Sequence, residues 1–171
     1  MGARGHIRVL PCDPDLGHKA DGGYLLIQRK NPPNQGKWSF PGGKLNWGET
    51  ILEGGQRELA EEVIFQGEDV TALLQWYPRP FSTADSIGFA ENQRTVEFHY
   101  VVVICFAELT WKADGLPSMI PYDDAADAKW WSMDELLQIH EEQKGVALTP
   151  GLVDHIVNAE LLYEKGLLSN N

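Results

Sequence analysis

The chain has few of the residues that several large classes of protein depend on. Only 2 of its 171 residues are cysteines, Cys12 and Cys105, and they are far apart. A disulfide framework or a zinc ribbon is therefore not expected, and two reduced thiols of a cytoplasmic protein are the simplest interpretation. Basic residues are also scarce, with 14 Lys and Arg against 25 Asp and Glu and a net charge of −11. Because phosphate backbones and anionic lipids are held by basic surfaces, we expect no nucleic acid and no membrane as partner.

Long hydrophobic runs and signs of subdivision are missing as well. The longest strongly apolar stretch, Tyr100 to Ala107, is far too short to span a bilayer, and the N-terminus has no apolar segment of a secretory signal. The sequence shows no repeat, no low-complexity segment and no linker. With 43% apolar and 23% charged residues, the chain can bury one core. We expect a soluble, cytoplasmic protein with a single domain over residues 1–171.

Short β-type runs alternate with helical patterns, but without strict βαβ repetition. We expect strands at 6–10, 23–28, 38–40, 70–77, 96–107 and 128–131. Helices are expected at 50–65, after Ser132, and after Thr149 and Pro150, which form an N-cap and first-turn pair. The nearly all-apolar run 96–107 predicts a central strand, and residues 78–93 predict a long functional loop. These patterns favour an α/β fold, an α/β/α sandwich around a mixed β-sheet.

The helix that begins after Thr50 carries three carboxylates on one side. Thr50 and Glu53 have the spacing of a capping box. Glu58, Glu61 and Glu62 occur at i, i+3 and i+4 and fall within a sector about 100° wide. Carboxylates this close repel one another, and a hard cation such as Mg²⁺ or Mn²⁺ would offset that cost. Taken alone, such a pattern is more often a solvated acidic face.

The residues around these carboxylates favour the metal site. Gly43, Glu49, Arg57 and the run Glu58-Leu59-Ala60-Glu61-Glu62 follow the spacing Gly-x5-Glu-x7-Arg-Glu-U-x-Glu-Glu-x-Gly-U, where U is a bulky apolar residue. This pattern resembles the Nudix box, the signature of Nudix hydrolases, at six charged or glycine positions. Ile64 departs from it, because the family has a glycine there that ends the helix. We therefore expect the helix to continue towards Gly67.

The resemblance implies metal-dependent hydrolysis of a nucleoside diphosphate linked to another moiety. It implies Glu58 and Glu62 as metal ligands, Glu61 as a third ligand or water-mediated partner, and close approach of the Gly42 backbone to the metal or the diphosphate. Arg57 would orient the carboxylates, and Glu49 would brace Arg57 or reach a metal. The expected catalytic set is Glu61, Glu62, Arg57 and Glu49. The general base stays open between a glutamate of the helix and four later acids, which are Glu97, Asp123, Asp124 and Asp127.

The substrate is indicated by weaker features. Pro80 lies fifteen residues beyond Phe65, which resembles the ADP-ribose pyrophosphatase branch and implies cleavage of ADP-ribose to AMP and ribose 5-phosphate. Arg29, Arg79 and Arg94 are candidates to contact the diphosphate or the terminal ribose. Three aromatic residues, Trp76, Tyr77 and Phe81, are candidates to stack on adenine. Two alternatives stay open: a pyrophosphohydrolase of oxidised nucleoside triphosphates, and a catalytically silent nucleotide-binding domain. The branch also implies a possible homodimer.

Overall fold

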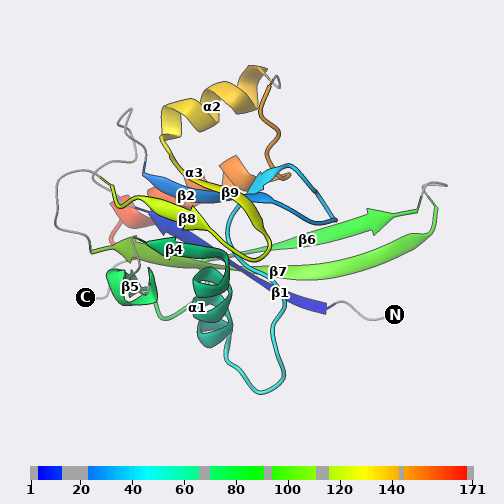
Figure 1. The fold of residues 1–171 in the computed structure, drawn as a ribbon, viewed down its shortest axis with the longest axis horizontal. Helices are drawn as coiled ribbons and strands as arrows, with labels where there is room; N and C mark the ends of the chain where they lie inside the picture. Colours follow the sequence, from blue (N-terminus) through cyan, green and yellow to red (C-terminus); the bar gives the residue numbers. More distant parts are fainter. Residues whose placement is uncertain are drawn as a thin grey trace.

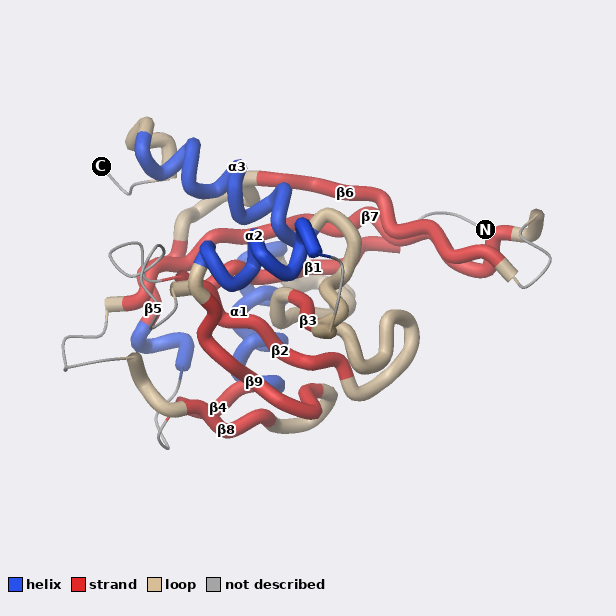
Figure 2. Tube along the Cα trace, turned by 90° about the horizontal axis from the view of Figure 1, so that it is seen from above, coloured by secondary structure: helices blue, strands red, loops and turns tan. Residues whose placement is uncertain are grey.

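The chain folds into three layers. The computed structural model describes residues 4–12, for which only the backbone is considered, and residues 23–65, 70–90, 94–110, 116–142 and 145–168. Helix α1 (Ile51–Glu62) lies on one side of the main sheet, and α2 (Met133–Glu142) and α3 (Leu152–Glu164) lie on the other (Figure 1). Figure 2 shows the same layers from above, with α2 and α3 in front of the strands and α1 behind them. The expected α/β/α sandwich is confirmed.

The main sheet has seven strands in mixed orientation. Its path runs β3 (Trp38–Ser39), β2 (Tyr24–Arg29), β1 (Arg4–Cys12), β7 (Val96–Leu109) and β5 (Leu74–Trp76), while β6 (Ser82–Phe89) pairs with β7 and β9 (Ala125–Trp131) pairs with β2. Strands β1 and β7 are parallel and the other pairs are antiparallel. A separate two-stranded sheet joins β4 (Val63–Phe65) to β8 (Met119–Pro121), and a 3₁₀ turn covers Val70–Leu73. The central place predicted for the run 96–107 is confirmed.

The core has two halves, one on each face of the sheet, because successive residues of a strand point to opposite faces. Leu26 and Phe106 belong to the half covered by α3, which contributes the buried Leu152 and Ile156. The half under α1 contains Leu59, and with it the buried Leu25, Ile27 and Phe65. None of the helices in the described parts of the chain is long and apolar enough to cross a membrane.

The acidic helix ends earlier than its sequence predicts. Helix α1 stops at Glu62, and Val63 has extended dihedrals, with φ −140° and ψ 132°. Residues Val63–Phe65 form strand β4, which pairs with Met119–Pro121. The β-branched Val63 and Ile64 favour this extended pairing, so Ile64 in place of the family's glycine does not prolong the helix and that prediction was wrong. Gly67, the predicted stop, lies outside the described residues.

Three other local predictions also need correction. Residues 82–89 form strand β6 instead of part of a functional loop, and small inward residues hide its strand signal. Residues 70–73 of a predicted strand form a 3₁₀ turn. Helix α3 follows Gly151, which has φ 75° and makes no side-chain cap, so Thr149 is not its N-cap residue. A left-handed residue at this position is easiest for glycine, which has no Cβ.

Candidate active site

The acidic helix is fixed at its N-terminus by the predicted capping box. Thr50 Oγ1 accepts a hydrogen bond from the backbone N–H of Glu53 at 3.3 Å, and the Glu53 carboxylate accepts one from the Thr50 N–H at 2.7 Å. Two of the backbone donors that a helix leaves unpaired are thereby satisfied. This fixes where α1 begins, two to three turns before the three carboxylates.

Arg57 joins the carboxylates into one network. Its Nη2 and Nε donate to the two oxygens of Glu49 at 2.7 and 3.1 Å, and its Nη1 donates to Glu58 and Glu61 at 3.0 Å each. Nη2 also donates to the Lys44 carbonyl at 2.9 Å, which ties the preceding loop to the helix. Hydrogen bonds from Arg57, and then from the Asn46 N–H, lower the pKa of Glu49 to about 2. Hydrogen bonds to Glu49, and then to Glu58, raise the pKa of Arg57, so the Arg57–Glu49 pair stays ionised at neutral pH.

The Gly42–Gly43 turn packs directly on the carboxylates of Glu58 and Glu62. The Gly42 N–H donates to Glu62 Oε2 at 2.7 Å, and Glu62 is only 4% exposed. Gly42 has φ 139°, a conformation that only glycine adopts without strain. A Cβ at position 43 would lie 2.5 Å from Glu58 Cδ, so the Glu58 carboxylate occupies the space beside the Gly43 backbone. The turn and the helix therefore hold Glu58 and Glu62 together.

The donor set is chemically suited to a hard divalent cation. Three carboxylates, those of Glu49, Glu58 and Glu61, share the Arg57 guanidinium, and a fourth, that of Glu62, accepts from the Gly42 N–H. Oxygen is the ligand atom that Mg²⁺ and Mn²⁺ prefer. Within the described ranges, no three Asp, Glu, His or Cys side chains converge as ligands of one ion. Glu58 and Glu61 instead share one Arg57 nitrogen. The glutamates are suitable ligands for a metal ion, and Arg57 would compete with that ion for Glu58 and Glu61.

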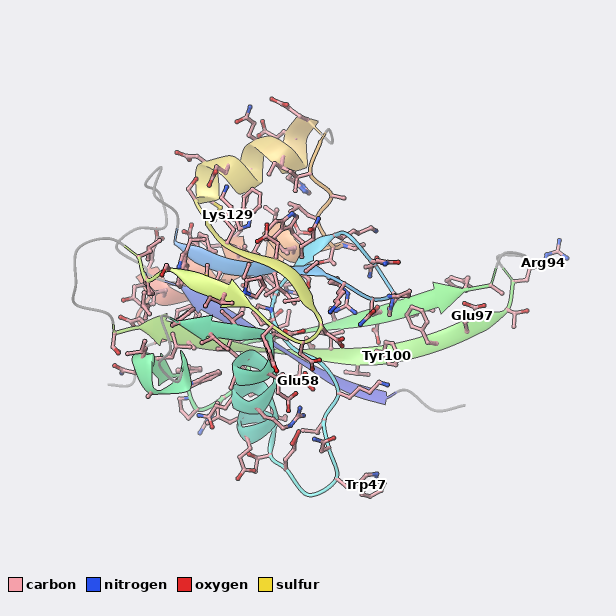
Figure 3. The ribbon with its side chains drawn as sticks, viewed as in Figure 1. Trp47, Glu58, Arg94, Glu97, Tyr100 and Lys129 are labelled. Carbon is pink, nitrogen blue, oxygen red and sulfur yellow. The ribbon has the colours of Figure 1, made fainter. Side chains whose placement is uncertain are left out.

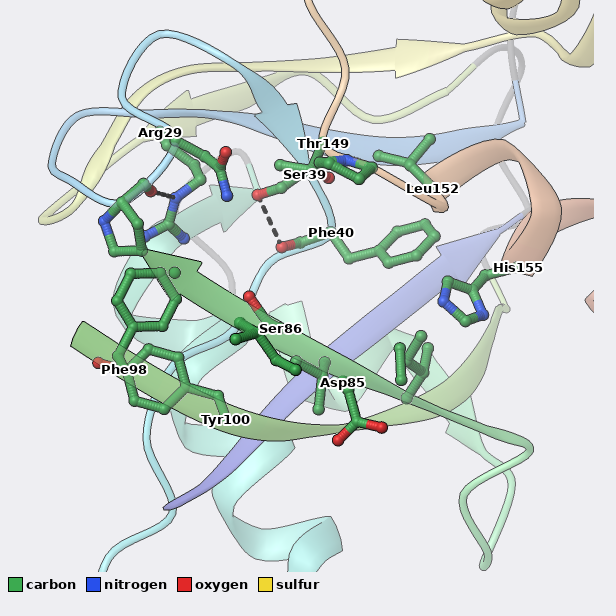
Figure 4. A pocket seen from close by; sticks show the side chains of 18 residues that line it. Arg29, Ser39, Phe40, Asp85, Ser86, Phe98, Tyr100, Thr149, Leu152 and His155 are labelled. Atoms are coloured by element: carbon green, nitrogen blue, oxygen red, sulfur yellow. Dashed lines mark hydrogen bonds between the residues drawn. The ribbon is translucent and has the colours of Figure 1, made fainter. Parts of the chain in front are cut away.

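A cavity of about 420 Å³ lies on the α3 side of the main sheet (Figure 4). Its walls are β6 and β7, the start of α3, and the segment from Ser39 to Phe40. That segment continues in the chain into Pro41, Gly42 and Gly43, so one stretch of backbone joins the cavity wall to the turn that holds Glu58 and Glu62. A volume of this size is typical of small-molecule sites.

The structure brings one of the predicted substrate residues to this cavity. Arg29 lines it, and its Nε donates to the Pro33 carbonyl at 2.8 Å. Arg79 and Pro80 are exposed and are not among the lining residues. Arg94 lies at the far end of the β6–β7 hairpin (Figure 3). The three aromatic candidates do not line the cavity either: Trp76 packs on the α1 half of the core, and Tyr77 and Phe81 pack on the other half.

The later acids lie in different places. The N–H of Tyr122 donates to the Glu62 carbonyl at 2.8 Å, which brings the loop with Asp123 and Asp124 beside the end of α1. Asp124 Oδ1 accepts from Asn31 Nδ2 at 2.6 Å, and Asp127 accepts from the N–H of Ala128 at 2.8 Å. Glu97 lies towards the hairpin tip (Figure 3). The chain thus places Asp123 and Asp124 near the acidic helix.

Sequence reasoning missed several residues of the cavity wall. Phe98 and Tyr100 line it from β7, and His155 lines it from α3. His155 Nδ1 lies 2.9 Å from Ser82 Oγ, and burial lowers the pKa of His155. The alternation within the run 96–107 already assigns Phe98, Tyr100 and Val102 to one face. What it could not indicate was a partner strand at 82–89 that extends the same wall beside β7.

Comparison with known proteins identifies the family. A family model described as the NUDIX domain matches residues 7–149. A bifunctional NMN adenylyltransferase/ADP ribose pyrophosphatase from Francisella tularensis, complexed with AMP and Mn ion, is 22% identical with a TM-score of 0.64, over 96% of this chain and 42% of that one. The present chain thus spans about two-fifths of the length of that relative.

Two further solved structures are similar along most of both chains. The NUDIX domain of Shewanella oneidensis NrtR, complexed with ADP ribose, is 19% identical with a TM-score of 0.62, over 95% of this chain and 90% of that one. The MutT NUDIX hydrolase from Burkholderia pseudomallei is 23% identical with a TM-score of 0.58, over 94% and 99% of the two chains. At these identities the similarity shows a common fold. Because the family match covers most of the chain and includes the acidic helix and the glycine turn, the chain belongs to the NUDIX domain family.

Proposed function

We propose that the chain hydrolyses the pyrophosphate bond of a nucleoside diphosphate linked to another moiety, with ADP-ribose as its preferred substrate. The products would be AMP and ribose 5-phosphate, and the cofactor Mg²⁺ or Mn²⁺. The observation that carries this proposal is the pairing of Glu58 and Glu62 with the Gly42–Gly43 turn, which directly follows the Ser39–Phe40 segment that lines a cavity of about 420 Å³. Relatives of the same fold that carry ADP ribose, or AMP with Mn ion, support the choice of substrate and metal.

The residues that would hold the metal are Glu58, Glu61, Glu62 and the backbone of Gly42. A divalent ion bound there supplies charge neutralisation of the diphosphate and acidification of a water molecule. Arg57 acts as a positioning residue, because its planar fork fixes Glu49, Glu58 and Glu61 at once. Without it, the mutual repulsion of the carboxylates would turn them away from one another.

The remaining assignments concern the reacting groups. Water attacks one phosphorus, a new phosphorus–oxygen bond forms, the bond to the bridging oxygen breaks, and a phosphate-bearing group leaves. The proton of the water passes to a carboxylate, for which Glu61, 46% exposed at its side chain, and the Asp123–Asp124 loop are the nearest candidates. Arg29 would contact the diphosphate or the terminal ribose from the cavity wall. Contacts by Arg79, Pro80 and Arg94 stay predictions, as does a single domain over residues 1–171.

The test is a phosphate-coupled hydrolysis assay with ADP-ribose, NADH, 8-oxo-dGTP and diadenosine tetraphosphate, first with Mg²⁺ and then with Mn²⁺. We expect metal-dependent turnover that favours ADP-ribose, yields AMP, and disappears with a chelator. Glu62→Gln should abolish it, because the amide keeps an acceptor for the Gly42 N–H but loses the charge. Glu141→Gln, on the exposed side of α2, is the matched control and should keep full activity.

Each other outcome has a definite meaning. Preferential turnover of 8-oxo-dGTP would keep the carboxylate roles and reject ADP-ribose as the substrate. Full activity in Glu62→Gln would reject the carboxylate roles themselves. A folded protein that binds Mn²⁺ and hydrolyses none of the four compounds would favour a silent nucleotide-binding domain.

A further inference from the structure

The guanidinium of Arg57 is held from two sides. On the side of the helix, Glu58 and Glu61 accept from its Nη1 at 3.0 Å each. On the side of the loop that precedes α1 (Figure 1), Glu49 accepts from Nη2 at 2.7 Å and from Nε at 3.1 Å, and the Lys44 carbonyl accepts from Nη2 at 2.9 Å. Each of the five N–H groups of the guanidinium therefore has an acceptor.

Asn46 lies in the same loop and adds a further contact on the loop side. With its amide oxygen towards the guanidinium, this oxygen accepts from Arg57 Nε at 3.1 Å and from Nη2 at 3.2 Å. The opposite orientation of the amide would place N–H groups against N–H groups, so the network selects the first orientation. The Asn46 backbone N–H also donates to Glu49 Oε1 at 3.0 Å. Asn46 thus contacts both members of the Arg57–Glu49 pair, although the Nudix pattern leaves its position open.

Asn46 has no part in the hydrophobic core. It is exposed, as are Leu45 and Trp47 on either side of it, and Figure 3 shows Trp47 at the outer end of the loop. A replacement at an exposed loop position should leave the fold intact. What distinguishes Asn46 from its exposed neighbours is its contact with the Arg57–Glu49 pair.

The contacts on the two sides of the guanidinium respond differently to a divalent ion. Glu58 and Glu61 are two of the expected metal ligands, and as ligands they are no longer available to Arg57 Nη1. The loop side then holds the guanidinium by itself. A contact alters the affinity for a ligand only if it contributes more in one of the two states, free or bound. Asn46 contributes more in the metal-bound state, because Arg57 then has fewer other acceptors.

We propose that Asn46 is a positioning residue of the active site, which keeps Arg57 on the loop so that the guanidinium does not follow the carboxylates of α1 when these bind a divalent ion. The inference rests on the proposed function, since it concerns the same carboxylates. Without Asn46, the guanidinium shifts towards Glu58 and Glu61 and competes more strongly with the ion for them. The loop of this chain thus supplies a third residue to the pair of Arg57 and Glu49.

The first measurement is made without metal. The Nε–H of Arg57 gives a ¹H–¹⁵N NMR signal, identified by its loss in Arg57→Lys, and its hydrogen exchange reports how well this group is hydrogen-bonded. In Asn46→Ala we expect exchange about tenfold faster, because a hydrogen bond to a charged group is worth at least about that factor. Asn46→Asp keeps an acceptor oxygen on a side chain of the same length, and its exchange should stay within about threefold of the unchanged protein. Asn158→Ala is the matched control, because Asn158 is exposed on α3, on the other side of the sheet, and it should change nothing.

The second measurement is a calorimetric titration with Mn²⁺. Asn46→Ala should weaken Mn²⁺ binding by about tenfold, the lower end of what loss of a residue that supports metal ligands costs. Asn46→Asp and Asn158→Ala should bind within about threefold of the unchanged protein. Thermal unfolding of each variant verifies that it is folded. The proposal is overturned if folded Asn46→Ala stays within about twofold of the unchanged protein in exchange rate or in Mn²⁺ affinity, or if Asn46→Asp loses as much as Asn46→Ala.

The two measurements also separate this inference from the proposed function. A protein that binds no Mn²⁺ and hydrolyses no substrate would refute the metal site, and the exchange rates alone would then decide whether Asn46 positions Arg57. A protein that hydrolyses ADP-ribose with Mn²⁺, and whose Asn46→Ala variant matches it in both measurements, would support the activity and refute the role of Asn46.

Discussion

Replacing Gly43 by alanine gives the sharpest test of the active-site geometry. The new Cβ would lie 2.5 Å from Glu58 Cδ, whereas carbon atoms in contact are ordinarily about 3.5 Å or more apart. The Glu58 carboxylate therefore has to move by about 1 Å. Its side chain is 14% exposed, which leaves it room to turn towards solvent and away from the turn.

The expected consequence is a large loss of activity with a small loss of stability. A displacement of about 1 Å at a catalytic constellation costs about 100-fold in rate, which corresponds to about 2.7 kcal/mol in the activation free energy. Gly43 does not have a left-handed backbone conformation, so alanine introduces no backbone strain there. We expect the free energy of unfolding to change by about 1 kcal/mol or less, because alanine also restricts the unfolded chain.

The assay compares kcat for ADP-ribose with urea unfolding on the same preparations. Gly145→Ala is the control, because Gly145 has φ 82° and open space around the position of a Cβ. It should lose about 1 kcal/mol of stability through backbone strain and keep its kcat. If Gly43→Ala keeps kcat within about threefold of the unchanged protein, the proposed contact between the turn and Glu58 has no part in catalysis and the reasoning fails.

Four further predictions follow from individual contacts. Arg57→Lys cannot reproduce the hydrogen bonds to Glu49, Glu58 and Glu61, and should lower kcat and Mn²⁺ affinity by about 10- to 100-fold. An unchanged Mn²⁺ affinity of the variant in a calorimetric titration would contradict this. Thr50→Ala removes the cap of α1 and should cost about 1 kcal/mol in urea unfolding, with Thr149→Ala, which caps no helix, as comparison. Burial lowers the pKa of His155 below its ordinary 6.5, so the unfolded chain binds a proton that the folded chain does not, and the free energy of unfolding should fall as the pH drops below 6.5. His155→Gln should remove that part of the pH dependence. The same slope of unfolding free energy against pH in both proteins would refute this. Light scattering should give twice the 19.1 kDa chain mass if the chain is a homodimer, and the single mass would contradict that expectation.

The acidic helix shows how far local sequence determines this protein. The capping box at Thr50 and Glu53 and the spacing of Glu58, Glu61 and Glu62 are properties of a few consecutive residues, and helical geometry alone places them on one side. The same holds for the buried face of α3 with Leu152 and Ile156, and for the central position of the apolar run 96–107. These features were predicted correctly because the signal and the structure span the same short stretch.

The features that were predicted wrongly depend on partners distant in the chain. Ile64 lies in a strand because Met119–Pro121 pairs with it, and residues 82–89 are a strand because β7 lies beside them. Neither pairing is visible in the local pattern, and the small residues of β6 resemble a loop in composition. At residues 82–89 tertiary pairing therefore overrode the local preference, whereas at Ile64 it agreed with the β propensity of that residue.

The sequence by itself determined the family, the places of the three helices and the carboxylates of the acidic helix, because each of these depends on residues at fixed spacing along one helix or turn. The tertiary structure alone decided which aromatic residues line the cavity and which arginine reaches it. It brought Phe98, Tyr100 and Arg29 together from separate strands and left Trp76, Tyr77 and Phe81 in the core or against it. The reason is that a strand's two faces look alike in sequence, and only packing against other elements makes one of them a core face and the other the wall of a site.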